Sequence, residues 1–238
     1  KQELIDEPIT KKEAVENILF NDCENFEIKS SEFWSKDFVP WKEENINLGK
    51  TLIKEEHGYE TLQGSGVVTG QLLGGCLDVF PMVIGTEILP TKSEWKDKIL
   101  LLETSEEKPS PDLVTYYLRN LGAQGIFDVI KGIIIGKPQE EKYYEEYKEV
   151  FRKVLKEFGK EELPVLYNIN IGHAFPIGIL PLGTDVQVDF TNKKICDIGT
   201  GAGFPGMVLA IVFDKGYFTL MESNNKKILF LEAVKADL

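Results

Sequence analysis

An acid and a histidine follow two predicted buried strands, and together they could move a proton. Glu103 ends the aliphatic run 99–102 and precedes a polar turn that contains prolines. His173 follows the apolar run 164–169, directly after Gly172. A carboxylate that fixes the tautomer of an imidazole makes that ring a general base. A solvated acid and an ordinary loop histidine are the alternative interpretations.

A glycine-rich loop near the end of the chain is the second pattern with chemical potential. A predicted strand over 194–198 leads through Gly199, Gly201 and Gly203 into a helix, and a second strand over 217–221 ends at Glu222. Glycines let backbone amides approach a ligand, and an acid after the next strand can bind ribose hydroxyls. The pattern is typical of nucleoside binding. A βαβ segment kept for its packing alone is the alternative.

Alternating strands and helices predict an α/β fold around both patterns. Helices are predicted over 1–22, 77–84, 112–121 and 140–158, and buried strands over 99–103, 132–136 and 164–169. We expect the glycine-rich segment 64–76 to form two short strands joined by a glycine turn, with Ser65 as a turn residue and not a nucleophile. The aromatic residues between 24 and 47 are expected to anchor a long loop.

Composition limits the classes of function. The 238 residues, 42% of them hydrophobic, suffice for one large domain or two small ones. A formal charge of −12 opposes binding to phosphate backbones, so we expect no nucleic-acid partner. We find neither a membrane-length apolar run nor a signal segment, and therefore expect a cytoplasmic protein without a membrane partner. The wide separation of Cys23, Cys76 and Cys196 predicts reduced thiols, with neither disulfides nor a zinc site.

Most of the chain resembles the C-terminal domain of the LD-carboxypeptidase and microcin self-immunity family of serine peptidases. The resemblance covers roughly residues 15–190 and rests on the segments 74–77, 85–87, 99–107, 118–126, 164–168, 172–173 and 180–183. It implies that Glu103 and His173 are the acid and base of a Ser-His-Glu triad that needs no cofactor and no metal. The implied substrates are peptidoglycan peptides or peptide-nucleotides. In that family the nucleophilic serine lies in a preceding domain, so we expect it to be absent here.

The end of the chain resembles the start of the small-subunit ribosomal RNA guanine methyltransferases of the glucose-inhibited division B type. The matching motifs are 197–206 and 222–226, within residues 193–238. The resemblance implies S-adenosylmethionine binding by Asp197, Gly199, Gly201, Gly203 and Glu222. The later strands that hold the substrate base in that family have no match here, so we do not expect methyl transfer.

These patterns predict an α/β protein in two parts: a peptidase-type domain over 1–192 with an N-terminal helix, and a partial Rossmann-like βαβ segment over 193–238. The first hypothesis is a chimeric protein without complete activity. The second is a serine carboxypeptidase whose serine comes from a missing domain or a partner, and the third is a nucleoside- or S-adenosylmethionine-binding module. We expect the tail to dock on the larger domain or on a second copy, which would give a homodimer.

Overall fold

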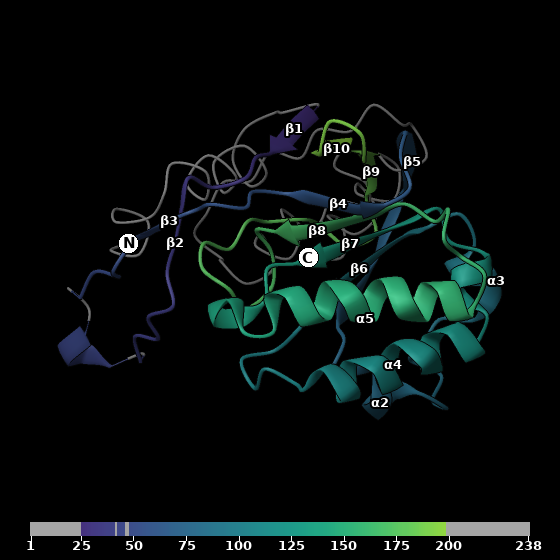
Figure 1. Ribbon diagram of the computed structural model, residues 1–238, viewed down its shortest axis with the longest axis horizontal. Helices are drawn as coiled ribbons and strands as arrows, with labels where there is room; N and C mark the ends of the chain where they lie inside the picture. Colours follow the sequence, from purple (N-terminus) through teal and green to yellow (C-terminus); the bar gives the residue numbers. More distant parts are fainter. Residues whose placement is uncertain (1–24, 41, 46–47, 199–238) are drawn as a thin grey trace, which may run out of the picture.

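An eight-stranded sheet of mixed direction forms the centre of the computed structural model (Figure 1), which describes residues 25–40, 42–45 and 48–198. The predicted helix over 1–22 lies outside the described residues. The strand order is β1-β10-β9-β5-β6-β7-β8-β4. These strands are β1 (Asn25–Ile28), β4 (Glu60–Gln63), β5 (Val67–Cys76), β6 (Ile99–Glu103), β7 (Gly132–Gly136), β8 (Val165–Ile169), β9 (Asp185–Asp189) and β10 (Lys194–Ile198).

Strands β5, β6, β7 and β8 run parallel in the middle of the sheet, and antiparallel strands extend it on both sides. Strand β10, where the predicted tail segment begins, pairs with β9 and with β1. Outside this sheet, β2 (Phe33–Trp34) and β3 (Ile53–Lys54) form a small two-stranded ladder. The ladder belongs to an arm that reaches away from the sheet (Figure 1).

Two long helices, α4 (Pro111–Ala123) and α5 (Tyr144–Glu157), cover one face of the sheet (Figure 1). Pro111 occupies the first turn of α4, and the Ser110 hydroxyl caps that helix by accepting a hydrogen bond from the backbone N–H of Leu113. The shorter helical elements are α2 (Phe80–Val83), α3 (Lys92–Trp95), η1 (Glu43–Asn45), η2 (Ile126–Asp128) and η3 (Gln139–Glu141). None of the described helices is long and apolar enough to cross a membrane.

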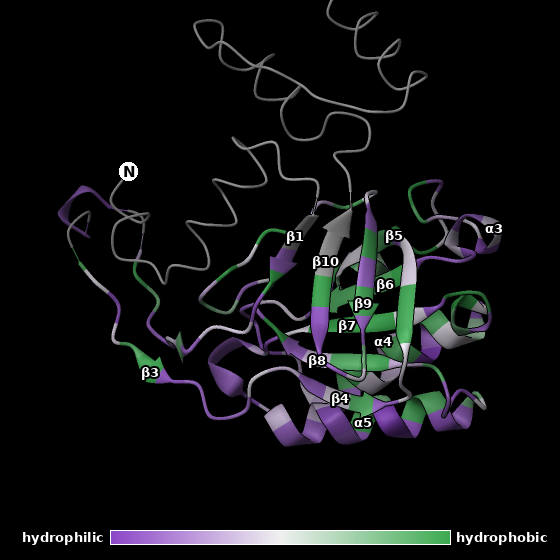
Figure 2. Cartoon of the chain, turned by 90° about the horizontal axis from the view of Figure 1, so that it is seen from above, coloured by the Kyte–Doolittle hydropathy of each residue, from purple (hydrophilic) through white to green (hydrophobic). Residues whose placement is uncertain are grey.

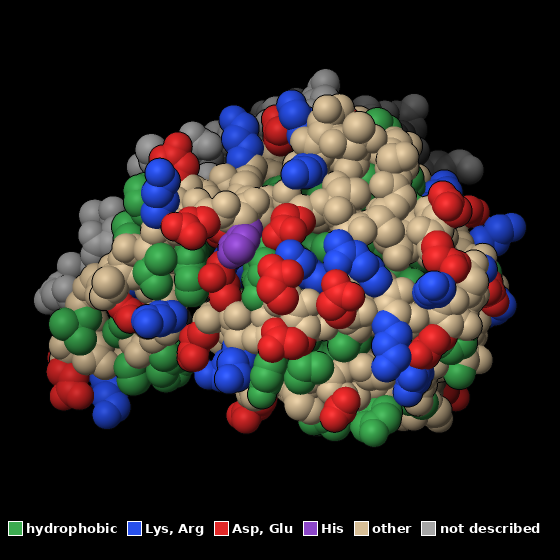
Figure 3. All heavy atoms as spheres, viewed as in Figure 1, with side chains coloured by type: hydrophobic (Ala, Val, Ile, Leu, Met, Phe, Trp, Pro, Cys, Tyr) green, Lys and Arg blue, Asp and Glu red, His purple; other side chains and the backbone are tan. Residues whose placement is uncertain are grey.

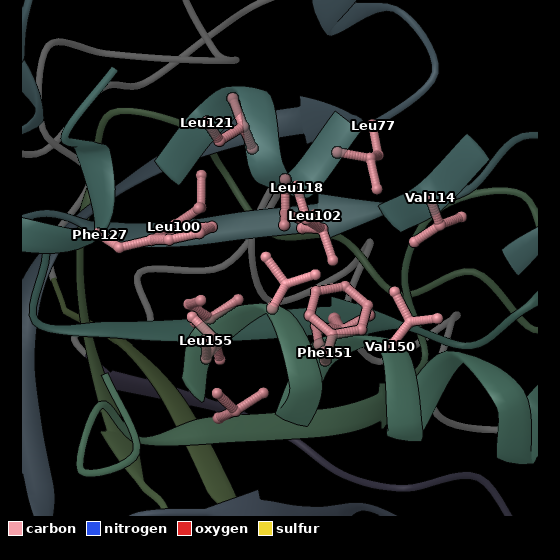
Figure 4. Close-up of a cluster of buried hydrophobic side chains, with 14 of the residues drawn as sticks. Leu77, Leu100, Leu102, Val114, Leu118, Leu121, Phe127, Val150, Phe151 and Leu155 are labelled. Carbon is pink, nitrogen blue, oxygen red and sulfur yellow. The ribbon is translucent and has the colours of Figure 1, made fainter. Parts of the chain in front are cut away.

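The central strands are buried on both faces, which explains why they are continuous aliphatic runs in the sequence. In β6, Leu100 and Leu102 point toward α4 and α5 and join the larger hydrophobic cluster (Figure 4). Ile99 and Leu101 belong to a second cluster on the opposite face. Strand β9 instead alternates buried and exposed residues (Figure 2). The predicted strands over 99–103, 132–136 and 164–169 are confirmed.

The prediction of two short strands within 64–76 is wrong. A single ten-residue strand, β5, follows the glycine turn, and its first half pairs with β9 while its second half pairs with β6. The glycines serve close strand packing: a Cβ on Gly74 would lie 1.9 Å from the backbone oxygen of Leu101. Ser65 lies in the turn before β5, as predicted.

The helix predicted over 140–158 begins later, at Tyr144. Glu140, Glu141 and Tyr143 all have positive φ angles near 55–60°, a left-handed conformation that no α-helix continues through. The apolar periodicity extends into this segment, but the segment forms the turn of η3. The helix predicted over 112–121 is confirmed as α4, one to two residues longer at each end.

Candidate functional site

The carboxyl ends of the four parallel strands meet at one edge of the sheet, and each strand brings a polar side chain to it. Strand β5 ends at Cys76 and β6 at Glu103, while Lys137 follows β7 and His173 follows β8. In open α/β sheets, ligand and catalytic sites lie outside this edge. The four residues are separated by up to 97 positions in sequence, so the sheet alone brings them together.

Glu103 and His173 form a direct pair at this edge. The Nδ1 atom of His173 lies 2.7 Å from Oε2 of Glu103. The Glu103 side chain is 9% exposed and the His173 side chain is 40% exposed. A neutral ring that donates from Nδ1 to this carboxylate keeps a lone pair on Nε2, which can take a proton from a reacting group. The structure thus brings the two predicted residues together, and their catalytic role stays a prediction.

Two glycines make room for the Glu103 side chain. A Cβ on Gly136 would lie 2.8 Å from the Cβ of Glu103, and a Cβ on Gly172 would lie 2.5 Å from its Oε2. Gly172 also has a φ of +88°, which side-chain-bearing residues rarely adopt. Neither glycine was predicted from the sequence to be part of the site. The Gly172-His173 dipeptide was the available signal, because a glycine beside a candidate base suggests close packing.

A second carboxylate contacts the other nitrogen of the same ring. Oε2 of Glu106 lies 3.2 Å from Nε2 of His173, and the Glu106 side chain is 61% exposed. This is the nitrogen that a nucleophilic hydroxyl would have to approach. Glu106 was also missed from the sequence, because nothing in the turn after β6 distinguishes it from its neighbour Glu107.

Cys76 lies beside the pair formed by Glu103 and His173. Its Sγ atom, a carboxylate oxygen of Glu103 and a ring nitrogen of His173 all lie within 4.8 Å of one another. Burial, followed by the negative charge of Glu103, raises the pKa of the thiol to about 12. Since the thiolate is the nucleophilic form, this raised pKa disfavours Cys76 as a nucleophile.

A buried lysine, Lys137, forms ion pairs and a hydrogen bond at the neighbouring part of the sheet edge. The Nζ atom of Lys137 is fully buried and lies 2.9 Å from Oε2 of Glu55 and 2.5 Å from Oε1 of Glu141. It also donates to Oδ1 of Asn168 at 3.3 Å and lies 4.7 Å from the ring centre of Trp34. Burial alone would raise the pKa of Glu55, but the hydrogen bond and charge of Lys137 bring that pKa below its ordinary value. No local pattern in the sequence indicates this cluster.

The remaining predicted residues lie elsewhere. The other histidine of the chain, His57, is not part of this edge: its ring stacks on Tyr144 at 4.4 Å between centroids, and its Nδ1 lies 3.9 Å from Oε1 of Glu60. Asp197 belongs to β10, where its backbone is opposite Val186 of β9. The other predicted cofactor-binding residues lie outside the described residues: Gly199, Gly201, Gly203 and Glu222.

Charges on the face shown in Figure 3 are mixed, with acidic and basic side chains close to one another. The described residues also form local ion pairs, such as Lys108 with Glu140 at 2.8 Å and Lys148 with Glu60 at 3.0 Å. A surface of this kind offers no continuous basic patch for a phosphate backbone on this face.

Comparisons with known proteins match the two parts of the chain separately. The family model for the LD-carboxypeptidase C-terminal domain matches residues 69–188, and the model for rRNA small subunit methyltransferase G matches residues 184–238. The Escherichia coli microcin C7 self-immunity protein MccF is 28% identical over 167 residues, which is 69% of this chain and 46% of that protein. The Mycoplasma capricolum ribosomal RNA small subunit methyltransferase G is 59% identical over 46 residues, 19% of this chain and 20% of that protein.

Solved structures agree with the first match. The MccF-like protein from Streptococcus pneumoniae, crystallised in complex with AMP, is 32% identical with a TM-score of 0.66, and the match covers 78% of this chain and 55% of that one. The MccF-like protein from Bacillus anthracis is 28% identical with a TM-score of 0.62, over 75% and 54% of the two chains. The chain spans about half the length of these peptidase relatives. Both predicted resemblances and the α/β fold class are confirmed.

Proposed function

Because the chain belongs to the LD-carboxypeptidase family through the C-terminal domain matched at residues 69–188, we propose that it supplies the acid and base of a serine carboxypeptidase site. The observation that carries the proposal is the 2.7 Å contact between a buried Glu103 and a half-exposed His173. In this role, His173 takes the proton of an attacking hydroxyl at Nε2 and returns it to the leaving amine. Glu103 fixes the tautomer and stabilises the imidazolium that forms.

The nucleophile in this proposal comes from a segment or partner other than the described residues. Among those residues, the contact of Nε2 is a carboxylate of Glu106 and not a serine hydroxyl. An acid and a base without a nucleophile cannot form an acyl-enzyme. In this proposal the chain is a chimeric, cytoplasmic protein that joins two of the three residues of a Ser-His-Glu triad to a methyltransferase-like tail and lacks complete activity by itself. The substrate class is a small peptide, from peptidoglycan or linked to a nucleotide.

Reconstitution tests the proposal. The chain is mixed with the unmatched N-terminal part of the Streptococcus pneumoniae relative, and release of the terminal residue is measured on a peptide that ends in an L,D-peptide bond. We expect hydrolysis only in the mixture, and a rate lower by a factor on the order of 10⁴ for Glu103→Gln. Hydrolysis that survives His173→Gln would overturn the assignment.

Imidazole ¹⁵N NMR on the chain alone provides a readout that does not depend on reconstitution. With a neutral ring, we expect the proton of His173 on Nδ1 in the native chain and a redistribution between the two nitrogens in Glu103→Gln. The control variant His57→Gln, at a histidine whose side chain is 39% exposed against 40% for His173, should leave the His173 signals unchanged. A native ring protonated on Nε2 would contradict the proposed arrangement.

We propose S-adenosylmethionine binding by the tail as a second candidate function, favoured by its 59% identity over 46 residues to a methyltransferase. The binding residues would be Asp197, Gly199, Gly201, Gly203 and Glu222. Isothermal titration with S-adenosylmethionine tests it, with Gly201→Val as the variant expected to abolish binding. No heat of binding in the native chain would refute this candidate.

A further inference from the structure

Three side chains with metal-binding chemistry converge where β5, β6 and β8 approach the same sheet edge. We propose that Cys76, Glu103 and His173 form a binding site for a thiophilic divalent cation of the Zn²⁺ type. Their sulfur, oxygen and nitrogen atoms lie within 4.8 Å of one another. The spacing of the cysteines had predicted no zinc site, but such spacing rules detect only ligands that are close in sequence.

The ligand types select the class of cation. Thiolate, imidazole and carboxylate are the common zinc ligands, whereas magnesium and calcium take oxygen ligands almost exclusively. Bonds of about 2.0–2.3 Å around a tetrahedral ion place ligand atoms about 3.3–3.8 Å apart. The largest separation, at most 4.8 Å, therefore needs to close by about 1–1.5 Å, while the 2.7 Å contact between Glu103 and His173 opens by about 0.6–1.1 Å. His173 lies on a loop and is 40% exposed, so its ring has room for this movement.

The sheet fixes the other two ligands. Cys76 is directly opposite Glu103 in the parallel ladder between β5 and β6, and the backbone N–H of Leu77 donates to the carbonyl of Glu103 at 2.8 Å. Both side chains thus start from rigid backbone positions at the same level of the sheet. Sites held on such elements lose little conformational entropy when the ligand binds.

A separate contact completes the arrangement expected around a metal. An imidazole that binds a metal through one nitrogen almost always donates its other N–H to a carboxylate or carbonyl. With the cation at Nδ1, the other nitrogen is Nε2, and Oε2 of Glu106 already lies 3.2 Å from it. Glu106, which is not one of the three proposed ligands, thus already occupies the position of the carboxylate that accepts from a metal-bound imidazole. The three protein ligands leave a fourth position for water.

Binding of the cation changes the protonation of Cys76 and His173. The S–H bond of Cys76 breaks, a metal–sulfur bond forms, and the thiol proton leaves to solvent. In the neutral ring of His173 the proton moves from Nδ1 to Nε2, where it faces Glu106, and the lone pair of Nδ1 binds the metal. A ring with Nε2 protonated cannot accept a proton from a nucleophile, so the cation would inhibit hydrolysis. Only this inhibition rests on the proposed function, since cation binding does not require a peptidase.

Cobalt titration of the reduced full chain tests the site, because thiolate-bound Co²⁺ has charge-transfer absorption that oxygen and nitrogen ligands do not produce. We expect a band that saturates at one Co²⁺ per chain and disappears when Zn²⁺ is added. Cys76→Ser should abolish it, whereas the control variants Cys23→Ser and Cys196→Ser should retain it. Glu106→Gln should weaken the affinity by about 10–100-fold.

A band that survives Cys76→Ser, or no band in the native chain at millimolar cobalt, would overturn the proposal. Circular dichroism of each variant ensures that a lost band does not reflect a failure to fold. Zn²⁺ inhibition of the reconstituted hydrolysis tests the consequence separately. Cobalt binding in a chain that never hydrolyses peptides would leave the metal site standing and refute the peptidase alone.

Discussion

Replacing Gly172 by alanine should disturb Glu103 and His173 without removing either residue. A Cβ at position 172 would lie 2.5 Å from Oε2 of Glu103 and 2.8 Å from its Cβ, and the backbone there has a φ of +88°. Real Cβ atoms do not approach so closely, so the carboxylate has to leave its slot. The Nδ1 contact of His173 should then lengthen or break.

Two effects add up in this variant, and the chain offers glycines that separate them. Gly85 has a φ of +81° with open space around it, so Gly85→Ala measures backbone strain alone, about 1 kcal/mol. Gly136 has no positive φ but would meet the Cβ of Glu103 at 2.8 Å, so Gly136→Ala measures overpacking alone, about 1–3 kcal/mol. Gly172→Ala combines both and should cost about 2–4 kcal/mol.

Urea unfolding provides the free energies, and ¹⁵N NMR of His173 reports the site. The Glu103→Ala variant removes two of the three closest atoms, so the double variant with Gly172→Ala should be more stable than additivity predicts, by about 1–2 kcal/mol. The His173 tautomer should change in Gly172→Ala and stay unchanged in Gly85→Ala. Gly172→Ala and Gly85→Ala are compared directly: equal losses of unfolding free energy in the two variants, with no coupling in the double variant, would refute the close packing of Gly172 against Glu103.

Two further predictions concern the buried lysine. Lys137→Met should lower the free energy of unfolding in urea by about 3–5 kcal/mol, because it leaves Glu55, only 6% exposed, without its cation. Adding Glu55→Gln should recover part of this loss. A loss below about 1 kcal/mol in Lys137→Met would contradict the prediction. Although burial opposes it, the net effect of Lys137 and nearby donors lowers the folded-state pKa of Glu55 below the ordinary 4.5. This stabilisation is therefore present above about pH 4.5 and lost as the pH falls through the folded pKa. Unfolding free energies between pH 7 and 3 should fall less steeply in Glu55→Gln than in the exposed control Glu56→Gln, and parallel curves would contradict the assignment.

The predictable parts of this molecule are those with a local sequence signal. The run from Ile99 to Leu102 identifies a strand because both faces of β6 are buried, and the end of that run places Glu103 at the functional edge. His173 follows from the same argument applied to β8. The geometry of parallel strands then supplies the expectation that both side chains meet.

The missed parts depend on contacts between distant segments. Gly74 suggested a break in the strand because glycine lowers strand propensity, but here it lets β5 pack against the backbone of Leu101 in β6. Lys137 follows a buried strand with no local sign that its partners come from residues 55 and 141. The late start of α5 is equally non-local, because the left-handed residue Glu141 turns its carboxylate toward Lys137.

Glu103 lies beside both His173 and Cys76, and its charge affects the protonation of each. Toward His173 it accepts the hydrogen bond of the ring N–H, while burial, together with the negative charge of Glu103, raises the pKa of the Cys76 thiol and keeps it protonated. A cation would reverse both effects at once, since it binds the thiolate and displaces the Nδ1 proton. Cys76→Ser should therefore remove metal binding and leave proton transfer intact. A Cys76→Ser variant that lost the His173 tautomer would show instead that the sulfur supports the base.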